Sequence, residues 1–240
     1  MLRRAASRRR CIPANTRQWA GFDGLDASNY FTTSPGTGIV GQQAGFHVQA
    51  WMWFETTAVN STKPIIDTVG GTPANRGWRF ATGTTNTTLN FGCYDTSTST
   101  TKTSPSWTVV TGRPVHVVGM IRSNAVRLFV DGVQVGTGTA IATFGTATSP
   151  IMTVGRRMQD TNSVVGTVRV LGGIAGGHYA PSDAEVLAAY QAGLSGKTVS
   201  HISGGTAQAQ WLFQRGSVPA SIAATVGSDV LTTVGAPTSI

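Results

Sequence analysis

The sequence predicts an all-β fold, a two-sheet antiparallel β-sandwich with one short helix. Runs of alternating apolar residues recur about every 10–12 residues, as they do in sandwiches. The chain of 240 residues holds 35 Thr and 30 Gly but only 12% charged residues. Thr favours half-buried strands and Gly supplies turns. This length is sufficient for one domain with a sizeable core.

The clearest strand signals lie in the middle of the chain. Apolar, mostly β-branched residues alternate over 115–120, 126–130 and 133–135. Asp131-Gly132 divides the last two runs, and Asp-Gly suits a type I′ hairpin turn, whose two central residues need positive φ. We therefore expect three antiparallel strands in a row, and a fourth over 151–154.

The run FHVQAWMWF, Phe46 to Phe54, is the most hydrophobic of the chain. Both of its alternating faces are largely apolar, which predicts a central strand that is covered on both sides. A pair of short strands joined by a turn is expected over 19–31. Shorter runs predict the remaining strands, at 65–69, 78–81, 89–94, 208–213 and 230–234.

A capping box predicts the helix near 182–192. The Ser182 hydroxyl can accept from the Glu185 amide, while the Glu185 carboxylate reaches back. Gly193 suits the C′ position that ends a helix. Three residues give the expected apolar face: Val186, Leu187 and Tyr190.

The positive charge is concentrated in an N-terminal arm. The net charge is +8, and residues 1–17 contribute +6 through six arginines without any acid: Arg3, Arg4, Arg8, Arg9, Arg10 and Arg17. Residues 18–240, which we expect to form the sandwich, are nearly neutral and lack an electrostatic footprint for nucleic acid. Nucleic acid would therefore bind through the arm if at all.

The arm has three interpretations. It lacks the apolar stretch of a secretory signal, but its Arg-rich, acid-free composition is typical of a transit peptide. The same composition fits an arm that grips an acidic protein surface or nucleic acid, or a solvated chain end. No run of 18 apolar residues occurs, so we expect no membrane span.

Four stretches resemble the concanavalin A-like jelly roll in its laminin-G-like form. They are WAGFDGLDASNYFTT, FHVQAWMWF, PVHVVGMIRSNAVRLFVDGVQVGTG with the later IMTVGRR, and GTVRVLGGIAGGHYAPSDAEVLAAYQAG. The resemblance implies two sheets packed face to face, about 10 Å apart. Because this superfamily includes lectins, glycosidases, adhesion modules and virion parts, the fold does not name the function.

The carboxylate inventory argues against a glycosidase, and we expect no catalytic residue. Retaining hydrolysis needs two carboxyl groups about 5–5.5 Å apart. Glucanases of the resembling fold carry them on one strand as E-x-D-x-x-E. This chain has two glutamates, Glu55 and Glu185, and no strand with acids two or four residues apart. It also lacks a G-x-S-x-G elbow, and its four histidines are scattered.

The resemblance also raises a calcium site. The candidate oxygen ligands fall in expected loops: Asp23, Asp26, Asp160 and Asn162. Plain turns account for the same residues without a metal, so we expect no cofactor. Cys11 and Cys93 are expected to be free thiols, because no disulfide-rich or zinc pattern is present.

Two functions from different classes remain open. The first is a structural virion component, such as a phage capsid-decoration, fibre or tail protein, whose arm anchors it to other subunits of the capsid or tail. A homo-oligomer is one form of this assembly. The second is an extracellular or cell-surface module that binds a glycan through Trp107 and Tyr94. Trp53 and Trp78 are assigned to the core instead, because they lie in alternating strands.

Overall fold

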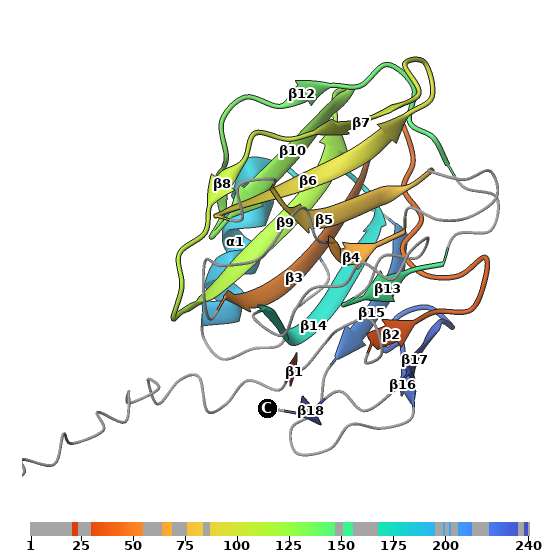
Figure 1. The fold of residues 1–240 in the computed structure, drawn as a ribbon, viewed down its shortest axis with the longest axis vertical. Helices are drawn as coiled ribbons and strands as arrows, with labels where there is room; N and C mark the ends of the chain where they lie inside the picture. Colours follow the sequence, from red (N-terminus) through yellow and green to blue (C-terminus); the bar gives the residue numbers. More distant parts are fainter. Residues whose placement is uncertain are drawn as a thin grey trace, which may run out of the picture.

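The computed structural model describes residues 21–23, 30–54, 64–68, 76–83, 87–146, 151–155, 168–194, 199, 202, 206–212, 221–234 and 238–239. Within these residues the chain forms two antiparallel sheets and one helix (Figure 1). The predicted all-β sandwich is confirmed.

Sheet A runs in the order β11 (Val133–Gln134), β10 (Ala125–Val130), β9 (Pro114–Arg122), β3 (Phe46–Phe54), β14 (Val168–His178), β1 (Gly21–Asp23) and β18 (Thr238–Ser239). In addition, β12 (Thr139–Ala140) pairs with β10, and β15 (Thr206–Leu212) pairs with β14. Sheet B runs in the order β16 (Ser221–Ala223), β17 (Val230–Val234), β2 (Tyr30–Thr32), β13 (Thr153–Val154), β4 (Pro64–Asp67), β5 (Trp78–Thr82), β6 (Thr88–Asp95) and β7 (Thr100–Thr103), with β8 (Trp107–Thr108) beside β6.

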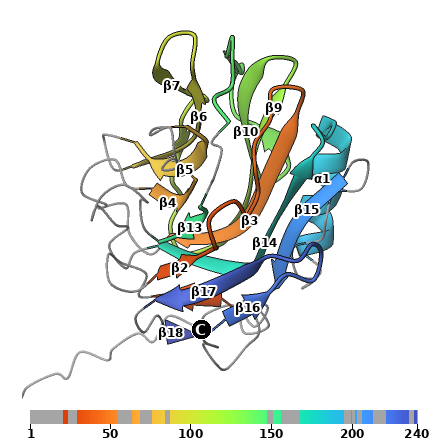
Figure 2. The same ribbon diagram turned by 90° about the vertical axis from the view of Figure 1, so that its right-hand side faces the viewer.

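The layers are clearest from the side. Figure 2 shows β4 to β7 on one side, the long strands of sheet A in the middle, and helix α1 (Asp183–Leu194) on the far side of sheet A. The main core lies between the sheets and is built from fully buried side chains, among them Phe46, Met52, Trp78, Phe91 and Trp211. Removing this apolar surface from water is the main force that holds the sheets together.

Strand β3 has the predicted bounds and is covered on both faces. Phe46, Val48 and Met52 belong to the main core, whereas Trp51 belongs to a separate cluster on the α1 side of sheet A. The intervening His47 is also fully buried. A strand with two apolar faces is therefore central, as its sequence predicted.

Two tight turns connect the strands in the middle of the chain. Ser123 and Asn124, with φ of 52° and 53°, join β9 to β10. Asp131 and Gly132, with φ of 52° and 83°, join β10 to β11. Both central residues of each turn are left-handed, as a type I′ turn requires. The Asp-Gly hairpin is confirmed, and Ser123-Asn124 forms a second turn of the same kind.

The expected fourth strand of this row is in the other sheet. Residues 153–154 form β13, which pairs with β2 and β4 of sheet B. The preceding loop crosses between the sheets, where Phe144 bridges to Asp95 of β6. Thr139–Ala140 instead pairs with β10 in sheet A. The two opening strands are likewise divided, because β1 pairs with β14 in sheet A and β2 with β13 in sheet B.

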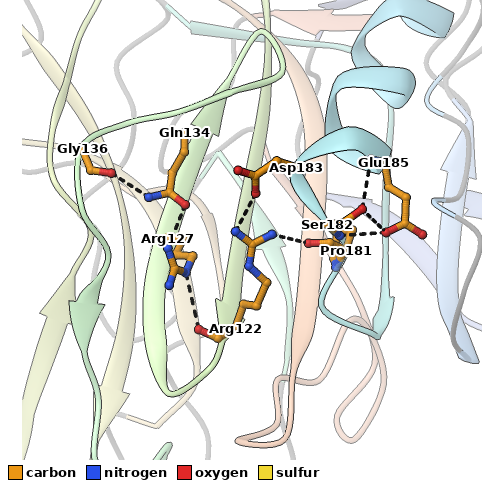
Figure 3. Close-up of polar contacts among 8 residues, drawn as sticks. All are labelled: Arg122, Arg127, Gln134, Gly136, Pro181, Ser182, Asp183 and Glu185. Atoms are coloured by element: carbon orange, nitrogen blue, oxygen red, sulfur yellow. Dashed lines mark hydrogen bonds and ion pairs between the residues drawn. The ribbon is translucent and has the colours of Figure 1, made fainter.

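Helix α1 begins with the predicted capping box. The Glu185 amide donates to the Ser182 hydroxyl at 3.4 Å, and the Ser182 amide donates to Glu185 Oε2 at 2.8 Å (Figure 3). Arg122 of β9 fastens the same end, because its guanidinium donates to Pro181 O at 2.7 Å and to Asp183 Oδ1 at 2.6 Å.

The end and the face of the helix differ from the prediction. Gly193 is not a C′ residue, because α1 continues through it to Leu194. Gly193 is buried, and a Cβ there would overlap the indole of Trp51. Of the expected apolar face, Val186 is buried, whereas Leu187 remains 40% exposed. Close approach to Trp51, and not helix termination, therefore explains the glycine.

Candidate functional site

The two aromatic residues expected to contact a sugar lie on opposite faces of sheet B. Trp107 is directly opposite Leu89 of β6, and directly opposed residues point to the same face. Leu89 is part of the main core, and the Trp107 ring packs against Phe54 with 6.3 Å between centroids. Tyr94 is five positions after Leu89 on β6. This odd spacing places Tyr94 on the outer face, about 17 Å from Leu89 along the strand. The structure does not bring the two rings together, and Trp107 packs on the core.

Three segments that are distant in the sequence meet at Tyr94. The Tyr94 amide donates to Gly77 O at 3.0 Å, the Gly77 amide to Gly145 O at 2.9 Å, and the Gly145 amide to Tyr94 O at 2.8 Å. This closed set of backbone bonds fixes the main chain that carries the ring. A Cβ on Gly145 would lie 2.9 Å from Tyr94 Cδ1 and 3.2 Å from Arg76 Cγ. The Tyr94 ring and the Arg76 stem therefore meet over the bare backbone of Gly145.

Asp95 secures the loops on which Tyr94 depends. Its buried carboxylate accepts from the Ser97 amide at 2.9 Å, the Ser97 hydroxyl at 2.7 Å, the Ala142 amide at 3.1 Å and the Thr143 amide at 3.2 Å. Burial by itself would raise the pKa of Asp95, but these hydrogen bonds outweigh burial and hold the pKa at about 2. Asp95 is thus an ionised acceptor that ties the turn after β6 to the 142–145 loop.

We define the Tyr94 site as Arg76, Tyr94, Thr96, Thr101 and Gly145. Its four side chains are all half-buried. Thr101 of β7 lies directly opposite Tyr94, and the Thr96 methyl group lies 3.0 Å from the point where Gly145 would carry a Cβ. The site combines an aromatic ring with one guanidinium and two hydroxyls. Such a set can pack against the C–H face of a sugar and hydrogen-bond to its oxygens.

A polar row in register crosses the outer face of sheet B: Thr232, Thr32, Thr153, Asp67, Arg79, Gly92 and Thr103. The middle of this row is inaccessible, because Thr153 and Asp67 are 1% and 0% exposed. Thr103, at the β7 end, is exposed. The methyl groups of Thr101 and Thr103 both lie near Gly92, so the accessible end of the row adjoins the Tyr94 site.

Glu185 in α1 and Asp131 in the β10–β11 turn have structural roles. Glu185 accepts from the Ser182 hydroxyl and amide (Figure 3). It also accepts from the Tyr179 hydroxyl, and these hydrogen bonds lower the pKa of Glu185. Asp131 accepts from the His116 amide at 2.9 Å. A glycosidase needs an acid whose pKa is raised. The pKa shifts of Asp95 and Glu185 have the opposite direction, and Glu55 lies outside the described residues.

The buried histidines belong to the packing beneath α1. His116 Nε2 lies 3.0 Å from Gln49 Oε1, and its ring centroid is 5.0 Å from that of Trp51. Burial lowers the pKa of His116 to about 3, so the ring is neutral at physiological pH. His47 Nδ1 lies 2.8 Å from Tyr179 O. These contacts identify both rings as structural.

Several predicted site residues lie outside the described residues. They are the arm arginines Arg3, Arg4, Arg8, Arg9, Arg10 and Arg17 and the calcium candidates Asp26, Asp160 and Asn162; of Asp23 only the backbone is described. In the described part of the chain, no group of three or more His, Cys, Asp or Glu could hold a metal ion. The described helix is too short to cross a membrane.

The sequence offered Tyr94 as a candidate contact but gave no sign of its surroundings. Arg76 and Gly145 carry no local pattern, because they come together only through long-range pairing. The one available signal was Asp95-Thr96-Ser97 after a strand, since an aspartate commonly accepts from the amide two residues on.

Two antiparallel sheets that enclose one core, with a helix on the outer face of sheet A, define a lectin-like jelly roll. The family model Laminin_G_3, described as the concanavalin A-like lectin/glucanases superfamily, matches residues 25–171. This match covers more than half of the chain, and the chain belongs to this family. The predicted family resemblance is confirmed.

Solved structures show the same fold at low identity. A candidate carbohydrate-binding protein from Bacteroides ovatus is 14% identical with a TM-score of 0.64, over 92% of this chain and 59% of that one. The binding domain of botulinum neurotoxin serotype D is 11% identical with a TM-score of 0.55, over 73% of this chain and 42% of that one. The chain thus spans less than two thirds of either structure. No curated protein sequence matches the chain.

Proposed function

We propose that this protein is a non-catalytic carbohydrate-binding module and that it binds its glycan at the Tyr94 site. The observation that carries the proposal is the meeting of three segments at Tyr94, which presents a ring beside a guanidinium and hydroxyls. Membership of a lectin-like family supports it. The likeness in fold to a candidate carbohydrate-binding protein agrees with it.

The rigidity of the site favours binding. Tyr94 is held by backbone hydrogen bonds on both of its polar main-chain atoms, and the neighbouring Asp95 fixes the adjoining loop. A ring that is already in position loses little conformational entropy when a ligand binds. The backbone that carries the Tyr94 ring therefore needs no rearrangement when a sugar binds.

The test is a glycan-array screen followed by titration of the best ligand. Tyr94→Ala removes the ring and is expected to weaken binding at least about tenfold, the effect of losing a central aromatic contact. Tyr94→Phe retains the ring and should lose much less. Thr232→Ala, on the exposed face of distant β17, is the matched control and should bind as the unaltered protein does.

Two results would remove the proposal. One is the absence of binding to any glycan on the array. The other is a Tyr94→Ala variant that unfolds at the same temperature as the unaltered protein and keeps its affinity.

A second proposal concerns the arm. Its charge of +6 within residues 1–17 suits attachment to an acidic surface of a larger assembly, such as a capsid or tail. In this proposal the sandwich projects from the particle, and it can still bind a glycan. A chain that lacks residues 1–17 should fold. It should not be incorporated into capsid or tail particles that assemble in its presence. Normal incorporation of the truncated chain would refute an anchoring arm.

A further inference from the structure

We propose that the Tyr94 site takes a sugar that carries a carboxylate, and that the guanidinium of Arg76 binds this group. The inference rests on the proposed glycan binding and adds the chemical class of the ligand. Three observations support this role for Arg76: its position beside the Tyr94 ring, its positive charge, and the engagement of the neighbouring acids with other groups.

The position of Arg76 ties its charge to the aromatic ring. Its Cγ lies beside the Tyr94 ring over Gly145, and both side chains are half-buried. The aliphatic stem of an arginine packs on apolar surface while its guanidinium stays at the water boundary. A sugar that lies on the Tyr94 ring therefore places its ring substituents within reach of this guanidinium.

Among the described residues, the acids near the site are engaged elsewhere. Asp95 is buried, and its carboxylate already accepts from two amides of the 142–145 loop and from Ser97. Asp67 is fully buried and lies directly opposite Arg79 of β5. The ion pairs recorded among the described residues involve Arg113 and Arg122, not Arg76.

The chemistry of guanidinium selects a carboxylate. The planar group donates two parallel N–H bonds to both carboxylate oxygens, a stronger pairing than any it makes with sugar hydroxyls. Arg79 also lies on this outer face, because its Cγ is near Gly92 together with the methyl groups of Thr101 and Thr103, and it is directly opposite the buried Asp67. A second nearby cation, Lys102, is directly opposite the core residue Cys93 and projects from the other face of β7. It offers a control that removes the same unit of charge.

The experiment compares ligands that differ only in the acid. Trigalacturonic acid is titrated against its methyl ester by calorimetry, and sialyllactose against lactose, with the full chain throughout. The first pair reports a uronic acid and the second a sialic acid. The acid of one pair should bind at least about tenfold more tightly than its neutral partner, and added salt should reduce the difference.

Two variants locate the carboxylate. In Arg76→Gln the preference for the acid over its neutral partner should disappear, and in Lys102→Gln it should remain. Thermal unfolding of each variant shows that the fold is retained. Arg76→Lys should recover part of the preference, because it restores the charge without the planar fork.

The outcomes separate this inference from the proposal beneath it. Equal binding of acid and neutral forms, lost in Tyr94→Ala, would overturn the acidic ligand and leave glycan binding intact. A preference for acid that survives Arg76→Gln would overturn the role of Arg76. The absence of Tyr94-dependent binding to any glycan would overturn both.

Discussion

Gly193 of α1 lies directly against the indole of Trp51 on β3. Both residues are buried, and a Cβ at position 193 would overlap the six-membered part of the Trp51 ring. The helix can approach sheet A this closely because position 193 has no side chain. This contact fastens the C-terminal end of α1, as Arg122 fastens the other end.

Gly193→Ala is therefore expected to destabilise the protein. In an exposed helix the same change would stabilise by up to about 1 kcal/mol. Here the added methyl group must displace Trp51 or the helix, which typically costs about 1–3 kcal/mol. Urea unfolding measures the change. Trp51→Phe makes room, so the double variant should lose less than the two single changes together. An unchanged or higher stability of Gly193→Ala would contradict the packing.

The Asp95 carboxylate gives the protein's free energy of unfolding a predictable dependence on pH in acid. Its folded pKa of about 2 is below the ordinary value of 3.8, so the ionised carboxylate stabilises the fold above pH 4. This contribution is lost as the pH falls through 2. Asp95→Asn should lower the free energy of unfolding at neutral pH by about 1–3 kcal/mol, because the NH2 group that replaces one carboxylate oxygen cannot accept from the amide that faces it.

The same pair of proteins tests the pH dependence. The gap in stability between the unaltered protein and Asp95→Asn should be constant from pH 7 to about pH 4 and should narrow between pH 4 and 2. Urea unfolding at several pH values measures it. A gap that is independent of pH down to 2 would show that Asp95 is not held ionised by these bonds.

The Ser123-Asn124 turn offers a stabilising change. Ser123 has a φ of 52°, a conformation that glycine adopts without steric cost. Ser123→Gly should raise the free energy of unfolding by up to about 1 kcal/mol. Gly132→Ala, at a φ of 83° in the neighbouring turn, is the opposite change and should lower it. Thermal unfolding of both variants measures these changes. A lower unfolding temperature for Ser123→Gly would contradict the positive φ at this position.

Cys93 should be an unreactive thiol in the folded protein. It is fully buried in the main core, and burial raises its pKa well above the ordinary value. In a Cys11→Ser background, a thiol reagent should therefore label Cys93 only after denaturant is added. Rapid labelling of the native protein would mean that the β5–β6 part of the core opens to solvent.

The sequence predicts the local features of this structure well and the long-range pairings poorly. Phe46–Phe54 and the Ser182–Glu185 box were predicted with correct boundaries or geometry, because alternation and capping are local. The placement of 151–154 was wrong, because pairing partners, and not local pattern, decide which sheet a short strand joins.

The candidate site shows the same limit. Tyr94 was predicted from its residue type and strand, but Trp107 was paired with it although register places the two on opposite faces. Arg76 and Gly145 join Tyr94 only through the hydrogen bonds among Gly77, Tyr94 and Gly145, which are 17 to 68 residues apart in the sequence. No spacing of residues within the sequence predicts such a site.

Amide chemical-shift mapping during titration with the best-binding glycan tests the central claim most directly. If the Tyr94 site binds the sugar, the perturbed amides will cluster at Arg76 and Gly77, at 94–101 and at 142–146, and Tyr94→Ala will abolish the shifts. Perturbations confined to the α1 side of sheet A, or to β16 and β17, would contradict binding at Tyr94.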